Sequence, residues 1–293
     1  MEEFLNEAND PEELRDRIKY AEPSRAVKPI YLFADSQPLF WSPDGVPFLR
    51  SACALIETHD PLAVYVGASN GDDPAFYSIF EAAMEQAGVE ERRMIPIDMN
   101  PDDLDSVERA DLILLSGGDV EQGWRAFEDN GLKRIIARRY NEGALLMGVS
   151  AGAVQIGLGG WSEKGKLIGT FRIIPHAIGA HEEEQGWAGV KEMVRHFGEH
   201  TRGYGIPAGG GMIYHPDHSI EPIRRPLYEF QIRKREVEQH ILLPGDGPVP
   251  DPDGDGLRAE DGIRDGDGIR DEDGLREDDG LEPEGDVLVI NGG

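Results

Sequence analysis

The chain has 293 residues and a formal net charge of −28, from 57 acidic and 29 basic side chains. A surface this acidic repels phosphate groups and anionic lipids, so we expect neither nucleic acid nor a membrane as a partner. With 39% hydrophobic residues, the chain has enough apolar material for one large α/β domain with added segments.

The first residues of the chain and its single cysteine indicate in which compartment the protein is expected. Residues 1–19 are charged and contain no apolar run like that of a secretion signal, and no run approaches the roughly 18 apolar residues of a membrane helix. One cysteine cannot form an intramolecular disulfide, so we expect Cys53 to be a buried small apolar residue. These features predict a cytoplasmic protein.

The first 28 residues predict a polar N-terminal appendage. It contains one short helix over 11–20, with Asp10 as the N-cap and Pro11 in the first turn.

Residues 29–244 predict an α/β domain with a mostly parallel sheet flanked by helices. Short apolar runs bounded by Gly, Pro, Asn and Asp alternate with amphipathic stretches, and runs that are apolar throughout are typical of strands buried on both faces. The expected strands are 29–34, 62–68, 94–97, 111–116 and 144–149, and the expected crossover helices are 74–87 and 132–140. Two later segments, 211–214 and 227–232, predict an antiparallel edge or a hairpin that closes the domain.

Residues 245–293 predict a disordered acidic tail. They carry seventeen Asp and Glu against four Arg, a net charge of −13, and an Asp-Gly pair recurs every six residues from Asp255. One apolar residue in six cannot offset the entropy of an ordered chain. A Ca²⁺ site is a second hypothesis, because Asp251, Asp253 and Asp255 resemble the start of a calcium loop, although Gly262 stands where its Glu belongs. A short solenoid or a segment that binds a protein partner is a third.

Two of the predicted strands end in glycine-containing turns that open helices. In the second turn, residues 148–152 read G-V-S-A-G, which matches the G-x-S-x-G nucleophile elbow and makes Ser150 the expected nucleophile. In the first, Gly117 and Gly118 let the backbone approach closely, so the N–H groups of Gly118 and Ala151 are the expected oxyanion hole. The alternative is that these glycines only allow close packing of strand and helix.

A serine nucleophile needs a base, and His181 is the best placed of the eight histidines because it follows a predicted strand. His176, five residues earlier, is the competitor. No histidine pair has zinc-ligand spacing beside a cysteine, so we predict neither a catalytic metal nor a cofactor.

Four short motifs carry a family resemblance. The GG turn at 116–119, the run G-V-S-A-G-A at 148–153, the P-x5-H spacing that ends at His181 and the G-I-P run at 205–207 resemble the serine peptidases that include dipeptidase E and cyanophycinase. The resemblance covers roughly residues 29–232 and implies the flavodoxin-like fold of the class I glutamine amidotransferases. It also implies Ser150 as nucleophile, His181 as base, Gly118 and Ala151 as oxyanion donors, and hydrolysis of peptide bonds next to aspartate.

The sequence departs from this family at two positions. Where dipeptidase E has a glutamate that orients the histidine, the chain has Ala208, and such a loss costs on the order of 10⁴-fold in turnover. The carboxylates considered as substitutes are those of Glu163, Glu182, Glu183 and Glu184. The second departure is Asp119, which in a substrate pocket would repel an acidic side chain and so favours a basic or neutral substrate.

An alternative role for Asp119 is to cap the following helix.

These observations predict a serine hydrolase, a peptidase of restricted specificity with a peptide substrate as its partner and a homodimer as a further hypothesis. A catalytically weak or inactive scaffold that binds a peptide or protein partner is the alternative, because Ala208 replaces the family acid. A third hypothesis is that the domain binds or processes the repeat tail. Glutaminase chemistry is disfavoured because serine stands where amidotransferases have cysteine.

Overall fold

The computed structural model describes residues 27–245. The expected helix at 11–20 lies outside the described residues, and so does the acidic tail beyond Gly245. The boundaries of the appendage and the tail, and the three hypotheses for the tail, therefore stay predictions.

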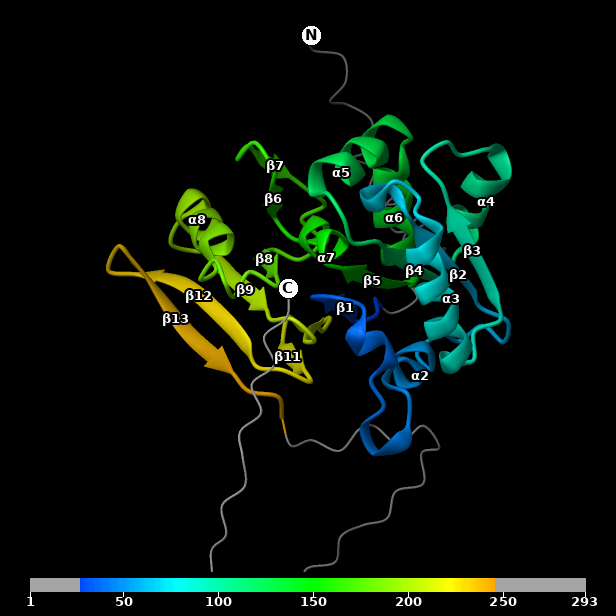
Figure 1. Cartoon of the computed structure of the whole chain (residues 1–293), viewed down its shortest axis with the longest axis horizontal. Coiled ribbons are helices and arrows are strands. Elements are labelled where there is room, and N and C mark those ends of the chain that lie inside the picture. Colours follow the sequence, from blue (N-terminus) through cyan, green and yellow to red (C-terminus); the bar gives the residue numbers. More distant parts are fainter. Residues whose placement is uncertain (1–26, 246–293) are drawn as a thin grey trace, which may run out of the picture. The chain divides into compact units, whose positions relative to one another are not determined.

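A seven-stranded, mostly parallel sheet forms the centre of the described region, in the order β11-β10-β1-β5-β4-β2-β3 (Figure 1). The five strands from β1 to β3 in this order pair in parallel, and β10 and β11 continue the sheet antiparallel to them. The strands are β1 Ile30–Phe33, β2 Leu62–Val66, β3 Glu91–Ile95, β4 Leu112–Leu115, β5 Leu145–Val149, β10 Gly211–Tyr214 and β11 Ile220–Ile223. The predicted α/β fold is confirmed.

The strand β3 begins three residues earlier than the sequence predicts. It lies at the edge of the sheet and is mostly half-buried, so its first residues, Glu91, Arg92 and Arg93, are charged. An edge strand exposes one side to water and therefore lacks the continuous apolar run on which the prediction depended.

Two hydrophobic cores cover the two faces of the sheet. Alternate residues of β1 divide between them: Ile30 and Leu32 enter one core, and Tyr31 and Phe33 the other, as the pleat of a strand requires. The first core includes residues of α4 Pro101–Arg109, α5 Val120–Asp129, α6 Leu132–Asn141 and α7 Ala151–Ile156, and the second those of α2 Phe48–Cys53 and α3 Pro74–Ala87.

Cys53 lies in the second core, where burial raises the pKa of its thiol to about 12.

The start of α3 matches its prediction because the sequence signals are strong there. Asp73 is the N-cap, its carboxylate accepts a hydrogen bond from the N–H of Ala75 at 2.9 Å, and Pro74 occupies the first helical position. Gly88 ends the helix in the left-handed conformation that glycine adopts without strain.

A second, four-stranded sheet follows in the order β13-β12-β9-β8. Its strands are β8 Ala177–Ala180, β9 Arg202–Ile206, β12 Leu227–Arg233 and β13 Glu236–Leu242, and α8 Ala188–Phe197 packs against it. Both late β segments of the prediction are strands: β10 extends the main sheet antiparallel, and β12 forms a hairpin with β13. A small hairpin of β6 Gly159–Trp161 and β7 Leu167–Gly169 completes the strands.

The connections of the described region contain three short 3-10 helices: η1 Gln37–Phe40, η2 Pro43–Gly45 and η3 Ala68–Asn70. Among residues 27–245, no helix has the length and apolar character needed to cross a bilayer.

Candidate active site

Ser150 stands on a strained turn between β5 and α7. Its backbone has φ 49° and ψ −111°, a conformation that costs a residue with a side chain on the order of 1–3 kcal/mol. Two backbone hydrogen bonds to neighbouring strands stabilise the turn. The N–H of Ser150 donates to the carbonyl of Phe33 on β1 at 2.8 Å, and the N–H of Gly152 donates to the carbonyl of Ser116, just beyond β4, at 3.0 Å.

Both glycines of the elbow are required by close packing. A Cβ at Gly152 would lie 2.2 Å from the carbonyl oxygen of Leu115, and one at Gly148 would lie 2.6 Å from the carbonyl carbon of Gly152. The two interpretations of these glycines are therefore compatible. Close packing of strand and helix makes the turn tight, and a tight turn is what exposes the serine hydroxyl in a nucleophile elbow.

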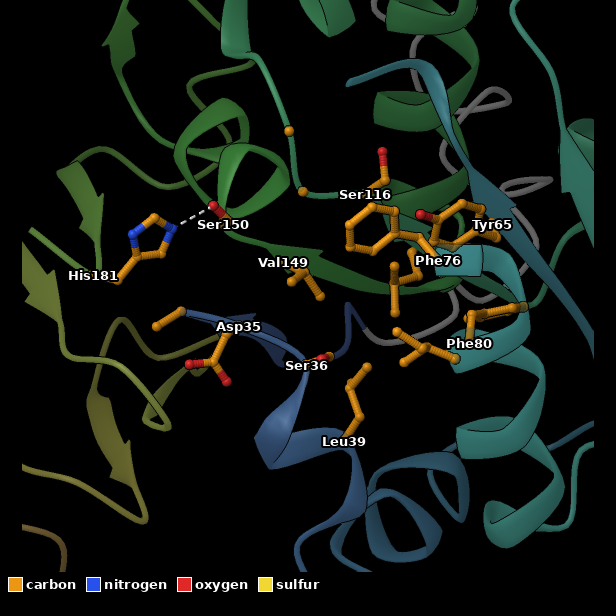
Figure 2. Close-up of a pocket in the computed structure, with 15 residues that line it drawn as sticks. Asp35, Ser36, Leu39, Tyr65, Phe76, Phe80, Ser116, Val149, Ser150 and His181 are labelled. Atoms are coloured by element: carbon orange, nitrogen blue, oxygen red, sulfur yellow. Dashed lines mark hydrogen bonds between the residues drawn. The ribbon is translucent and has the colours of Figure 1, made fainter. Parts of the chain in front are cut away.

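His181 is brought to Ser150 by the second sheet. It directly follows β8, where its N–H donates to the carbonyl of Ile206 at 2.9 Å and its own φ is 46°. Its Nε2 lies 2.8 Å from Oγ of Ser150. A dashed line marks this contact in Figure 2. This distance permits direct proton transfer from the hydroxyl to the ring.

The competitor His176 is a packed residue. Its ring lies between those of Tyr204 and Tyr214, at centroid distances of 5.2 and 6.0 Å. Burial, with a smaller contribution from the positive charge of Arg202, lowers the pKa of His176 to about 4. Among the described residues, His181 contacts Oγ of Ser150 and His176 does not.

The buried His176 predicts a loss of stability in acid. Because its pKa is about 4 in the folded chain and about 6.5 in an unfolded one, the unfolded state binds more protons between these values. Stability is therefore complete above pH 6.5 and falls toward pH 4, by about 2 kcal/mol once solvent screening of the half-buried ring is allowed for. Urea unfolding at pH 7 and pH 4.5 measures this loss.

The variant His176→Phe should lose about 1.5 kcal/mol less than the parent between the two pH values. The matched control is His59→Gln, which removes an exposed imidazole. Equal acid sensitivity in His176→Phe and the parent would contradict the prediction.

The two expected oxyanion donors lie beside the nucleophile. Gly118 and Ala151 line one cavity together with Ser150, and within the described part of the chain neither backbone N–H donates a hydrogen bond. Gly118 has φ 129°, and a Cβ there would lie 2.1 Å from the carbonyl oxygen of Ser69. That same carbonyl accepts the N–H of Asp119 at 2.7 Å, so the GG turn rests directly on η3.

Gln155 is a structural residue of the site that sequence reasoning missed. It is fully buried in α7, and its Nε2 donates to Oγ of Ser69 and to the carbonyl of Val120, each at 3.1 Å. One amide thus connects η3, α5 and α7, the three segments that surround Gly118. A single glutamine in a helix carries no sequence signal for such a role.

No carboxylate of the described residues makes a hydrogen bond to Nδ1 of His181. Two carboxylates instead hold the loop at the position of the missing family acid. Glu183 accepts the N–H of Ala208, and Asp35 accepts the N–H of Gly209 at 2.6 Å and that of Gln37 at 2.8 Å. Sequence reasoning missed Asp35, which follows β1 and lines a cavity with Ser150 and His181.

The other three proposed substitutes also do not reach Nδ1. Glu182 directly follows His181. Burial, the larger effect, raises the pKa of its carboxyl, while hydrogen bonds that it accepts from the N–H groups of Val190 and Gly189 at the start of α8 lower this pKa. Glu184 is exposed. Glu163 lines a separate cavity that contains Asp119 but not Ser150.

Asp119 caps a helix. Its Oδ1 accepts the N–H of Gln122 at 2.6 Å at the start of α5. It lies next to Gly118 in sequence but lines neither of the two cavities that contain Ser150.

Two cavities include Ser150 in their lining. One, of about 220 Å³, extends toward α3 and is shown in Figure 2. The other, of about 320 Å³, includes Ala151, Trp161 and Glu182. Both are lined by Gly118, Ser150 and His181, so the two cavities share the residues around the nucleophile. Within residues 27–245, no group of three or more His, Cys, Asp or Glu has the geometry to hold a metal ion.

Comparisons with known proteins place the chain in a family. The family model of peptidase family S51 matches residues 54–221, more than half of the chain, and this range includes Ser150 and His181. No curated protein matches the sequence.

Two solved structures are similar to the described fold. A peptidase from an acI-B1 Actinobacterium is 16% identical with a TM-score of 0.56, over 76% of this chain and 97% of the other. A putative peptidase E protein from Listeria monocytogenes EGD-e is 17% identical with a TM-score of 0.46, over 74% of this chain and 100% of the other. The first supports the fold, and the family match extends to the residues of the elbow. The chain belongs to peptidase family S51, the family of dipeptidase E and cyanophycinase that its motifs resemble.

Proposed function

We propose that the chain is a serine peptidase of restricted specificity in which Ser150 is the nucleophile and His181 the general base. The observation that carries this proposal is the 2.8 Å contact between Oγ of Ser150 and Nε2 of His181 on a strained elbow. A serine hydroxyl is a weak nucleophile unless a base is within hydrogen-bond reach, and this contact supplies one.

The reaction follows from the positions of these groups. Oγ of Ser150 attacks the peptide carbonyl while Nε2 of His181 takes its proton. The N–H groups of Gly118 and Ala151 face the oxygen that becomes negative, and His181 then returns the proton to the leaving amine. Water, activated by the same ring, hydrolyses the acyl-enzyme and frees Ser150.

Because no carboxylate of residues 27–245 makes a hydrogen bond to Nδ1 of His181, the proposed catalytic unit is a Ser-His dyad. The ring of His181 becomes an imidazolium during the reaction, and its Nδ1 proton is then stabilised by solvent because the ring is exposed. Asp35 lines the same cavity, but its carboxylate accepts from the N–H groups of Gln37 and Gly209 and makes no hydrogen bond to His181. We therefore expect slower turnover than in an enzyme with a complete triad.

A peptide digest tests the proposal. The full-length chain is incubated with a mixture of synthetic peptides of two to ten residues, and new amino termini are identified by mass spectrometry. We expect cleavage by the parent and about 10²-fold less cleavage by Ser150→Ala. No cleavage by the folded parent, or equal cleavage by both proteins, would reject the peptidase.

A peptide-binding scaffold is the second candidate. Two observations favour it: Ala208 stands at the position of the family acid, and Nδ1 of His181 has no carboxylate partner among the residues described. It predicts peptide binding that Ser150→Ala leaves unchanged, together with no hydrolysis by the parent. Turnover by the parent that depends on Ser150 would exclude it.

A further inference from the structure

The cavity of about 220 Å³ beside Ser150 has an apolar wall built from three aromatic rings. Tyr65 comes from β2, and Phe76 and Phe80 come from α3; we call these three residues and the space they enclose the aromatic pocket (Figure 2). Leu39, Leu114 and Val149 complete its apolar lining. A cavity of 150 Å³ with a similar lining is large enough for benzene, so this space accepts one large apolar side chain.

The polar end of Tyr65 is directed to another partner. Its hydroxyl accepts a hydrogen bond from Nδ2 of Asn70 at 2.7 Å, and its ring packs against Phe80 with centroids 5.4 Å apart. Tyr65 therefore presents the surface of its ring to a ligand in the pocket, and apolar contact with this ring favours binding.

Phe76 stands one helical turn before the buried Phe80 and lines the pocket, yet it is 50% exposed. Nothing in the described part of the chain covers it completely. A substrate side chain in the pocket would remove this apolar surface from water, which favours binding in proportion to the area buried.

The charges around Ser150 oppose an acidic side chain. No Lys or Arg is among the described residues that line either cavity containing Ser150, whereas Asp35 lines the first and Glu182 the second. An aspartate side chain placed there would lose its hydration without gaining a positive partner and would face a like charge.

From these observations we infer that the aromatic pocket selects a substrate with a large apolar side chain, such as that of Phe, Leu or Met, at a residue flanking the scissile bond, and that it rejects Asp and Glu there. This inference rests on the proposed peptidase function. It departs from the aspartyl specificity that the family resemblance implies.

Three phosphonofluoridates that differ in one arm, methyl, phenethyl or carboxyethyl, test the inference. Each would react at Ser150 with loss of fluoride, so intact mass against time gives a second-order rate constant for each arm. We expect the phenethyl probe to react at least about tenfold faster than the methyl probe, because the arm enters the pocket. The carboxyethyl probe should react more slowly than the methyl probe.

Phe76→Ala should lower the phenethyl-to-methyl ratio by about threefold or more, because it removes the half-exposed wall of the pocket. The matched control is Leu104→Ala, which removes an exposed apolar side chain from α4 and should keep the parent ratio. Circular dichroism confirms that both variants fold.

The outcomes separate the two proposals. If the methyl probe reacts and the carboxyethyl probe reacts as fast as the phenethyl probe or faster, the assignment of the pocket is overturned. Ser150 then remains the nucleophile. An unchanged ratio in Phe76→Ala overturns the role of the aromatic wall. No reaction of the folded parent with any of the three probes overturns the peptidase and the substrate assignment with it.

Discussion

Replacement of Ser150 or His181 by Ala is expected to lower kcat for peptide hydrolysis by about 10²-fold, and the double variant by no more than either single one. In a serine peptidase with a complete triad, loss of the serine or the histidine costs about 2 × 10⁶-fold, and loss of the acid alone about 3 × 10⁴-fold. The ratio of these two factors is about 70, which is what the remaining serine and histidine contribute when no acid is present. No carboxylate of the described residues makes a hydrogen bond to Nδ1 of His181, so the factor of about 70 applies to this chain.

Steady-state kinetics on the two single variants and the double variant measure this effect. The double variant should match the single ones because the two side chains act as one unit. The matched control is Ser36→Ala, which removes a hydroxyl from the lining of the same cavity and should keep kcat within about twofold. A loss near 10⁶-fold in Ser150→Ala would contradict the dyad, since it would require a carboxylate that completes the triad during turnover.

Replacement of Gly118 by Ala is expected to lower kcat by about 10²- to 10³-fold, the cost of losing an oxyanion donor. Its Cβ would lie 2.1 Å from the backbone carbonyl oxygen of Ser69, a residue whose Oγ accepts a hydrogen bond from Gln155. The GG turn must therefore shift, and the N–H of Gly118 moves away from the carbonyl oxygen of the substrate.

Gly131→Ala is the control for backbone strain. Gly131 also has a positive φ, of 73°, but a Cβ there meets nothing within 4 Å. Both variants carry the cost of a side chain at positive φ, and only Gly118→Ala adds the collision beside Ser150. We expect Gly131→Ala to keep the parent kcat, and a kcat for Gly118→Ala within threefold of the parent would contradict the oxyanion role.

The fold was predictable because the central strands are buried on both faces. The ends of β1, β2, β4 and β5 lie within two residues of the predicted ends. A strand that is buried on both faces is apolar along its length, so the limits of the apolar run indicate the limits of the strand. The edge strand β3 and the hairpin of β6 and β7 gave weaker signals. Edge strands carry charged residues, and β6 and β7 are only three residues long.

The candidate site was predictable only where its residues form a local motif. Ser150, Gly118 and Ala151 lie in short glycine patterns whose geometry is set by the chain around them. Asp35 and Gln155 have no such pattern, because their contacts span 174 and 86 residues of sequence. Contacts of this length depend on how strands are ordered in the sheet, which local sequence does not encode.

The most direct test of the central claim is the intact mass of the full-length chain after reaction with a broad fluorophosphonate. The claim is that Ser150 is a nucleophile activated by His181. It predicts one added probe per chain in the parent, none in Ser150→Ala and a slower addition in His181→Ala. An unlabelled but folded parent, or a label that remains in Ser150→Ala, would contradict the claim.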